Sequence, residues 1–399
     1  MGAAHPRGTS RRRFLAAGGA GLATAALGAV VARELEPEPA TPTAAQPAVP
    51  AEQIGRVDPH GVHQAGLHLP TRPPTHLYFH VFDAGAGLTV AHLQRTLATL
   101  GDDITSLTAL DPRDPRLLTD PELLTVQIGI GERLLALTGV EVPLALPEFA
   151  RSSAIPDRCR GGDLVIAVAA DAPETTAQVS DAITGVLARA GFTPRWSQLT
   201  WRPKGEGMVT INPLGFDDGI VQPETTSGTP DHVFLTEGAA AGASVGVVRR
   251  FELDTAGFAE LDVPEQEAIF GRVRATGAPL SGGAKFDDPN LLAKTPHGVY
   301  LIPTGSHVRA AHPSFTDSTV MLRRSYGFRE SVDGRPDRSG LLFMSFQDDV
   351  EVFSRTQLRM DREDRLMDFA TPTAEIAFLV LPGFDADRPL GSPLFTGRP

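Results

Sequence analysis

Hydrophobic and polar residues follow two rhythms along the first half of the chain, from about Val57 onward. Residues 76–83 alternate, with Leu77, Phe79 and Val81 on one face, which predicts a half-buried strand. Residues 124–130 and 163–169 are apolar runs bounded by turn residues and predict buried strands. Helical patterns cover residues 88–100, 132–137 and 175–190. With a last strand at residues 208–211, the order β-α-β-β-α-β is that of a ferredoxin-like unit.

The second half repeats this order of elements without any repeat at the level of residues. Strands are predicted at residues 244–253, 320–328, 341–346 and 375–381, and helices at 264–274 and 350–360. Residues 223–230 are rich in Pro, Thr, Ser and Gly, as expected of a boundary. The sequence therefore predicts an α+β fold of two ferredoxin-like domains, at residues 57–223 and 224–399.

The first 56 residues do not fit this pattern. Residues 10–15 (SRRRFL) match a twin-arginine export signal, and an Ala/Gly-rich apolar run follows to Ala32. We interpret residues 1–32 as a signal peptide cleaved near Ala32, with an uncleaved anchor as the alternative. Residues 33–56 have the composition of a disordered linker. Because this route exports folded proteins, it suits a protein that receives a cofactor in the cytoplasm.

Composition narrows the classes of function. The net charge of −12 over 399 residues argues against a nucleic-acid-binding surface. A single cysteine, Cys159, excludes an intramolecular disulfide and a cysteine-based zinc or iron–sulfur site. His60, His63 and His68 form a candidate metal cluster, although a histidine-bearing surface loop is the favoured interpretation.

The candidate chemistry lies in residues 304–328. A histidine, His307 or His312, could ligate haem iron. Arg323 and Arg324 are neighbours on a predicted strand, so their side chains should point to opposite faces and only one can enter a given pocket. An arginine there could stabilise charge developing on bound peroxide.

Peroxide chemistry at haem iron needs two further groups, a base for the peroxide and a partner for the ligating histidine, and a carboxylate can serve as either. The glycine-bounded turn at residues 215–219 (GFDDG) offers Asp217 or Asp218 as a base for peroxide. Since two buried neighbouring carboxylates would repel each other, one of them should face solvent. Asp348 or Asp349 could accept the second N–H of a ligating histidine.

Several segments, in order, resemble the dye-decolourising peroxidases, especially their twin-arginine-exported bacterial members. The likeness covers nearly all of the region predicted to fold. The matching segments are HQAGL at 63–67, GGDL at 161–164, GFDDG at 215–219, TGAPL at 276–280, SHVR at 306–309, LRRSY at 322–326 and FQDD at 346–349.

The resemblance implies a role for each matching residue. It makes Asp218 the distal aspartate, Arg323 the distal arginine and His307, rather than His312, the haem ligand, with Asp349 supporting that histidine. Arg309 and Ser325 are further expected cofactor contacts. Ser325 stands where the family has glycine, and Ile220 where it often has threonine, so the polarity of the pocket is expected to differ.

The resemblance also implies an architecture and an activity. The architecture is a dimeric α+β barrel-like arrangement of the two domains, with haem b held mainly by the second. The activity is reduction of hydrogen peroxide with oxidation of organic donors such as dyes and phenolics. The alternatives are an exported, deferrochelatase-like iron-handling protein and a silent binding module. We expect a periplasmic, extracellular or cell-envelope protein without a stable membrane anchor, and leave room for a homo-oligomer.

Overall fold

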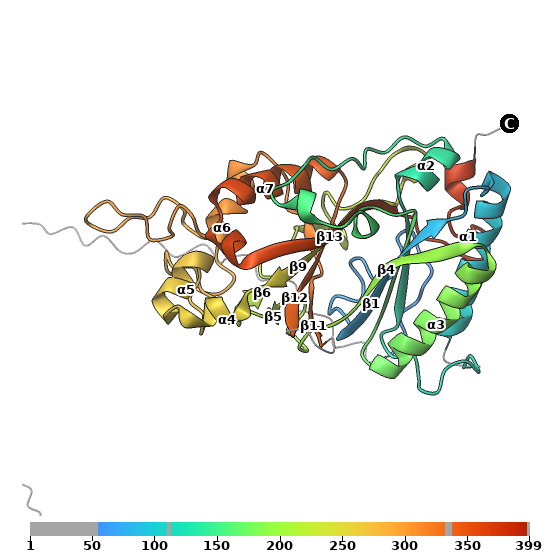
Figure 1. Cartoon of the computed structure of the whole chain (residues 1–399), viewed down its shortest axis with the longest axis horizontal. Coiled ribbons are helices and arrows are strands. Elements are labelled where there is room, and N and C mark those ends of the chain that lie inside the picture. The colour runs from blue at the N-terminus through green and yellow to red at the C-terminus, as the bar shows by residue number, and fades with distance from the viewer. Residues whose placement is uncertain (1–54, 110–112, 332–336, 397–399) are drawn as a thin grey trace, which may run out of the picture. The chain divides into compact units, whose positions relative to one another are not determined.

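The computed structural model describes residues 55–109, 113–331 and 337–396 (Figure 1). The predicted signal peptide, and the predicted linker except for Gly55 and Arg56, lie outside these residues. The helices are α1 (Val90–Thr108), α2 (Glu132–Thr138), α3 (Pro173–Arg189), α4 (Thr255–Glu260), α5 (Val263–Phe270), α6 (His307–Ala310) and α7 (Val350–Glu363). In the described part of the chain no helix is both long and apolar enough to cross a membrane.

The long strands and the two-residue strand β10 form one antiparallel sheet that closes on itself. Its members are β1 (His76–Ala84), β2 (Thr125–Ile130), β3 (Leu164–Ala170), β4 (Phe192–Trp201), β9 (Ser244–Leu253), β10 (Leu322–Arg323), β11 (Tyr326–Glu330), β12 (Arg338–Gln347) and β13 (Ala370–Val380). Short two-stranded pieces are β5 (Thr210–Ile211) with β6 (Asp217–Asp218), and β7 (Thr225–Thr226) with β8 (Thr229–Pro230).

Each half of the chain has the same strand order. The strands of the first half are ordered β4-β1-β3-β2 in the sheet, and those of the second half β13-β9-β12-β11. In both halves, the first of these four strands along the chain lies between the fourth and the third. β2 pairs with β13, and β4 pairs with β11, so the two halves close into one barrel. The α+β class is confirmed. The domain boundary at residue 223 stays a prediction, since the described residues on both sides of it belong to one compact unit.

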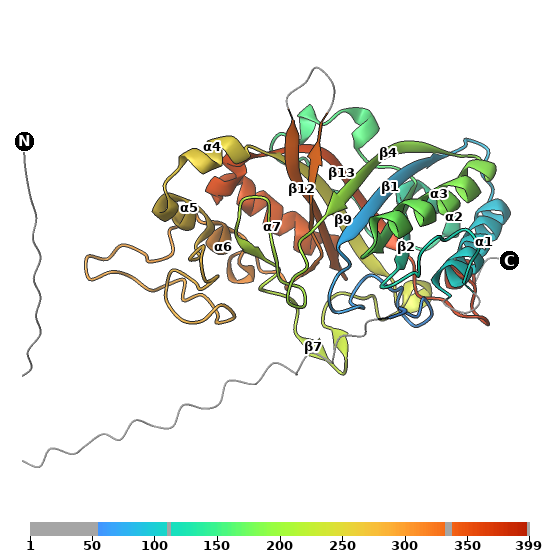
Figure 2. The same ribbon diagram turned by 90° about the horizontal axis from the view of Figure 1, so that it is seen from below.

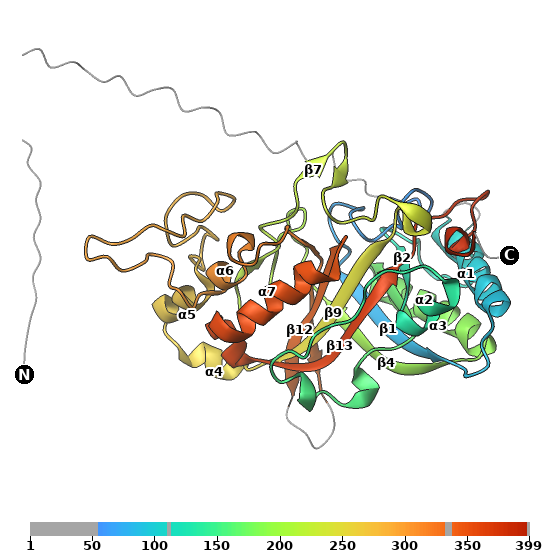
Figure 3. The same ribbon diagram turned by 90° about the horizontal axis from the view of Figure 1, so that it is seen from above.

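Apolar residues fill both faces of the sheet. Leu77, Phe79 and Val81 of β1 pack together inside the barrel, as their alternation predicts. The other face of the sheet is covered by helices. α3 packs on β1, β3 and β4, and α7 packs on β9 and β12 (Figures 2 and 3). A helix that covers a sheet in this way needs only one apolar stripe, which the sequence pattern supplies.

Three predicted elements require correction. The last strand of the first half is β4, not residues 208–211, which contribute only the short β5. β4 was missed because many of its residues are exposed and its apolar pattern is weak. α1 continues eight residues beyond Leu100, since Ile104 and Leu107 keep its buried stripe. The predicted strand at residues 320–328 is interrupted between β10 and β11.

Candidate active site

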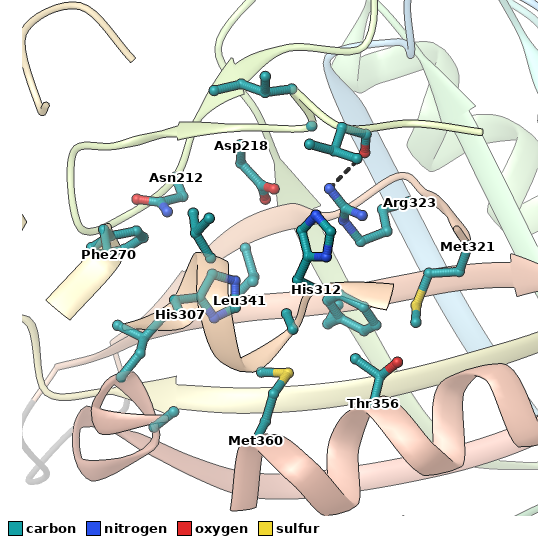
Figure 4. Close-up of a pocket in the computed structure, with 18 of the residues that line it drawn as sticks. Asn212, Asp218, Phe270, His307, His312, Met321, Arg323, Leu341, Thr356 and Met360 are labelled. Carbon is teal, nitrogen blue, oxygen red and sulfur yellow. Dashed lines mark hydrogen bonds between the residues drawn. The ribbon is translucent and has the colours of Figure 1, made fainter. Parts of the chain in front are cut away.

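A largely apolar pocket lies beside α7 and is shared by segments that are distant in sequence. It is bounded by the turn at residues 212–221, by β10, by α6 and by α7. In Figure 4, Asp218 and Arg323 point into it from one side, and Thr356 and Met360 of α7 lie on the opposite side. Apolar residues on its wall are Phe251, Leu253, Phe270, Leu341, Phe343, Phe353, Met360 and Leu366.

His307 begins the short helix α6 and lies on the pocket wall. Its Nδ1 atom is 2.7 Å from Oδ2 of Asp364, whose side chain is fully buried. Burial lowers the pKa of His307, but the carboxylates of Asp364 and Asp218 oppose this shift, and the net pKa is raised. Because Nδ1 donates to a carboxylate, Nε2 is the nitrogen left to bind a metal.

The expectation that Asp349 supports His307 is wrong. Asp349 caps the N-terminus of α7, where its Oδ1 accepts the backbone N–H of Glu351 at 3.0 Å. Asp364 follows the other end of the same helix. Fourteen helical residues span about 21 Å. The neighbouring Asp348 also faces elsewhere, with its Oδ2 3.3 Å from Nδ1 of His232.

Asp218 and Asp217 are separated by strand alternation in β6, which pairs with β5. Asp217 is held by Lys285, with Nζ 2.8 Å from Oδ2, and its side chain is 11% exposed. The idea that one of the pair faces solvent is therefore wrong, because a lysine neutralises Asp217 instead. Phe216 anchors the turn by stacking on Phe270, with ring centroids 3.8 Å apart. Asp218 remains as the carboxylate without an ion-pair partner among the described residues.

Arg323 is fixed beside this turn. Its Nη2 donates to the carbonyl oxygen of Val221 at 2.8 Å. The side chain of Gln222 accepts the backbone N–H of Arg323 and donates to its carbonyl oxygen. Burial lowers the pKa of the Arg323 guanidinium, and the charge of Asp218 opposes that shift. Asp218 also acts electrostatically on His307. The three groups therefore share one pocket.

Arg324 points away from the pocket, as strand alternation predicts. It is buried and donates to the carbonyl oxygens of Leu67 and Pro70.

Two predicted cofactor contacts do not line the pocket. Arg309 donates to the carbonyl oxygen of Leu291, and its guanidinium lies over the rings of Tyr300 and Phe315. It stabilises the loop behind α6. Ser325 is buried, and its Oγ has no hydrogen-bond partner among the described residues. Neither residue is among those on the pocket wall.

The other candidate sites are not supported as metal centres. Among the described residues no group of three histidine, cysteine or acidic side chains could hold a metal ion. His63 stacks on Phe234 with ring centroids 3.5 Å apart and bonds the carbonyl oxygen of Gly242. Cys159 is a free, half-buried thiol.

The donor set fits haem. One imidazole presents Nε2, a buried carboxylate fixes its other nitrogen, and the surrounding wall suits a flat apolar macrocycle. On the far side an arginine and an aspartate face the same space, as peroxide chemistry requires. Fold and site together therefore define the class of haem peroxidases.

Comparison with known proteins narrows this class. The family described as Dyp-type peroxidase, C-terminal, matches residues 210–385. The chain is 30% identical over 375 residues to a deferrochelatase of Yersinia pseudotuberculosis serotype I, covering 84% of both chains. It is 30% identical over 298 residues to a dye-decolorizing peroxidase of Thermobifida fusca, covering 69% of this chain and 68% of that one.

Solved structures agree with these matches. A DyP-type peroxidase from Cellulomonas bogoriensis superposes with a TM-score of 0.78 at 31% identity, over 86% of this chain and 99% of that chain. A DypB variant of Rhodococcus jostii RHA1, solved in complex with heme, shares the fold with a TM-score of 0.60 at 19% identity, over 86% and 99% of the two chains. This chain belongs to the DyP-type peroxidase family, and it is a peroxidase of that type.

Sequence reasoning missed two residues of the site. Asp364 lies in the charged run DREDR at residues 361–365, which resembles any solvated helix end. Gln222 had no distinguishing signal beyond its nearness to the GFDDG turn. Only the folded chain brings Asp364 to His307 and Gln222 to Arg323.

Proposed function

We propose that this chain binds haem b through His307, reduces hydrogen peroxide and oxidises organic donors such as dyes and phenolics. One observation carries the proposal. Asp218 and Arg323 line the same apolar pocket as His307, which Asp364 holds from behind. Asp217 also lines the pocket but is paired with Lys285, and Arg324 is bonded outside the pocket.

Haem, when bound, would supply a redox-active iron for the reduction of peroxide and the one-electron oxidation of donors. Nε2 of His307 would hold the iron, and Asp364 keeps the ring in the required tautomer. Asp218 takes the proton from the inner peroxide oxygen and returns it to the outer one. Such proton transfer contributes about 10²–10⁴-fold in rate.

Arg323 stabilises the negative charge that develops as the oxygen–oxygen bond separates. Its hydrogen bonds to Val221 and Gln222 hold the guanidinium in place before peroxide arrives. A charge that is already positioned needs no reorganisation during the reaction.

Stopped-flow absorbance tests these roles. Haem-loaded protein mixed with peroxide should show a fast change of the haem absorption band, slowed about 10²-fold or more in Asp218→Ala and in Arg323→Leu. Asp217→Asn is the matched control and should react like the wild type, because Asp217 is paired with Lys285. Unchanged rates in both distal variants would refute the assignment.

A second function has support in the relatives named deferrochelatase, one of them 30% identical to this chain. It would use the same pocket and release iron from haem. Incubation with haem followed by assay of free iron and intact porphyrin tests it. Porphyrin recovered without iron would support this second function, and haem recovered intact would remove it.

We also propose that the protein is exported by the twin-arginine route to the periplasm, the cell envelope or the medium, after folding as two ferredoxin-like domains. The SRRRFL segment and the apolar run after it support export. Arg11→Lys with Arg12→Lys should retain the protein in the cytoplasm, and export of this double variant would refute the route.

A further inference from the structure

The two distal residues are carried by segments that are far apart in sequence. Asp218 lies on the short hairpin of β5 and β6, and Arg323 on the two-residue strand β10. No hydrogen bond or ion pair joins Asp218 to Arg323, both of which the structure describes. Because their action on one peroxide depends on their relative position, another contact has to fix the base against the guanidinium.

The free edge of β10 shows what makes this contact. β10 ends the strand order of the sheet, and among the described strands it pairs with β12 alone. The backbone N–H of Arg323 donates to Oε1 of Gln222 at 3.1 Å, and the carbonyl oxygen of Arg323 accepts Nε2 of Gln222 at 3.2 Å. A neighbouring antiparallel strand would make the same two bonds, so the side-chain amide of Gln222 takes the place of a strand on this edge.

The same amide also contacts the turn that carries Asp218. An amide NH₂ has two donors, and Nε2 of Gln222 also donates to the carbonyl oxygen of Gly219, at 3.3 Å. Gly219 directly follows Asp218 in the chain. If the amide of Gln222 were reversed, its oxygen would face two carbonyl oxygens. The three hydrogen bonds therefore fix the orientation of this side chain.

A further bond ties the guanidinium to the same short segment. Nη2 of Arg323 donates to the carbonyl oxygen of Val221 at 2.8 Å, close to the site of Asp218 in Figure 4. Residues 219–222 thus hold Arg323 at its backbone and at its guanidinium, and Asp218 immediately precedes them. Moving the guanidinium relative to the base requires these bonds to break.

We propose that Gln222 is the positioning residue that sets the geometry between Asp218 and Arg323. Gln222 is not part of the pocket wall, so it acts on the reaction through these two residues. Its role extends beyond support of Arg323, because one side chain holds the arginine and the turn of the base together. The inference rests on the proposed peroxidase function.

Gln222→Met tests this role, since methionine is unbranched and flexible enough to fill the space but makes none of the three hydrogen bonds. In stopped-flow absorbance, haem-loaded Gln222→Met should react with peroxide about 10- to 100-fold more slowly, the effect expected when a catalytic group is displaced by about 1 Å. Combined with Arg323→Leu, the same substitution should have a much smaller effect, because no guanidinium is left to position.

Fluoride binding to the ferric, haem-loaded protein is a second measurement, and it does not depend on turnover. Fluoride on ferric iron accepts hydrogen bonds from donors on the distal side. A displaced Arg323 should therefore weaken fluoride binding about 2- to 10-fold, which is the loss expected for one hydrogen bond.

Gln64→Met is the matched control. The Gln64 side chain is buried and also makes three hydrogen bonds to the backbone, with Ile128 and Leu381, but it lies outside the pocket wall. Gln64→Met should lower the temperature of unfolding and leave the peroxide rate and the fluoride affinity unchanged.

A wild-type peroxide rate and fluoride affinity in Gln222→Met would overturn the inference. Equal effects of Gln222→Met with and without Arg323→Leu would also overturn it, because Gln222 would then act independently of the arginine. The same slowing in Gln64→Met would mean that lost stability explains the effect, and the inference would be wrong. If Arg323→Leu alone reacts like the wild type, the proposed function is refuted and this inference falls with it.

Discussion

Replacing Asp364 by asparagine should reverse the tautomer of His307. The carboxylate of Asp364 has two tasks, because Oδ2 faces Nδ1 of His307 and Oδ1 accepts the backbone N–H of Leu366 at 2.9 Å. In Asp364→Asn, the amide oxygen can keep the bond to Leu366. The amide NH₂ then faces Nδ1 of His307 and favours the ring with its proton on Nε2. That ring cannot ligate iron until the proton moves.

The magnitude follows from the bond that is lost. A hydrogen bond of 2.7 Å to a buried carboxylate contributes about 1.5–3 kcal/mol. This corresponds to a loss of about 10- to 100-fold in haem affinity, the range found when partners of metal-ligating histidines are removed. The cofactor-free protein loses the same bond, so its thermal stability should also fall, although the cap itself is kept because asparagine caps a helix as well as aspartate does.

Haem transfer to an excess of a competing haem acceptor measures this effect as a dissociation rate. Asp349→Asn is the control, since Asp349 caps α7 at its other end and should leave haem retention unchanged. The reasoning is refuted if Asp364→Asn retains haem like the wild type. If Asp349→Asn alone loses haem, Asp349 rather than Asp364 supports His307, as the family motif implies.

Three further outcomes are expected. Gly219→Ala should destabilise the protein by about 1–3 kcal/mol and slow the peroxide reaction. The backbone φ of Gly219 is +85°, and an added Cβ would lie 2.5 Å from a backbone oxygen, so the turn that carries Asp218 would be displaced. Unchanged unfolding and peroxide kinetics would contradict this. Burial lowers the pKa of His80 to about 4. Between pH 6.5 and 4 only the unfolded chain therefore binds this proton, and the free energy of unfolding falls by about 3 kcal/mol as the pH falls. Denaturant unfolding of His80→Gln should lack this pH dependence, and a pH profile identical to that of the wild type would refute the role of His80. Arg249→Met should lower the free energy of unfolding by about 3–5 kcal/mol, because it leaves Glu375 buried without its Arg249 partner. Adding Glu375→Gln should restore part of this loss, as measured by thermal unfolding. No recovery in the double variant would mean that packing, not charge, explains the loss.

Local patterns of apolar and polar residues were sufficient to predict a strand where its own residues show which face is buried. The alternation of Leu77, Phe79 and Val81 predicted the inner face of β1, and the apolar runs at β2 and β3 predicted buried strands. β4 failed this test because a barrel strand can be exposed on one side and still be held by backbone bonds to its neighbours. Its place in the sheet depends on β1 rather than on its own residues.

The sequence by itself determined the fold class and the chemical groups of the site. The spacing in residues 304–328 supplied a histidine and an arginine pair, and alternation required that only one arginine enter the pocket. Tertiary structure decided the partners. Lys285 neutralises Asp217, whereas Asp218 has no ion-pair partner within the described ranges, and Asp364 rather than Asp349 holds His307. Which carboxylate supports His307 depends on its distance in space from the ring. Asp349 and Asp364 are similar in sequence but lie at opposite ends of α7, and a local sequence pattern does not contain this difference in distance.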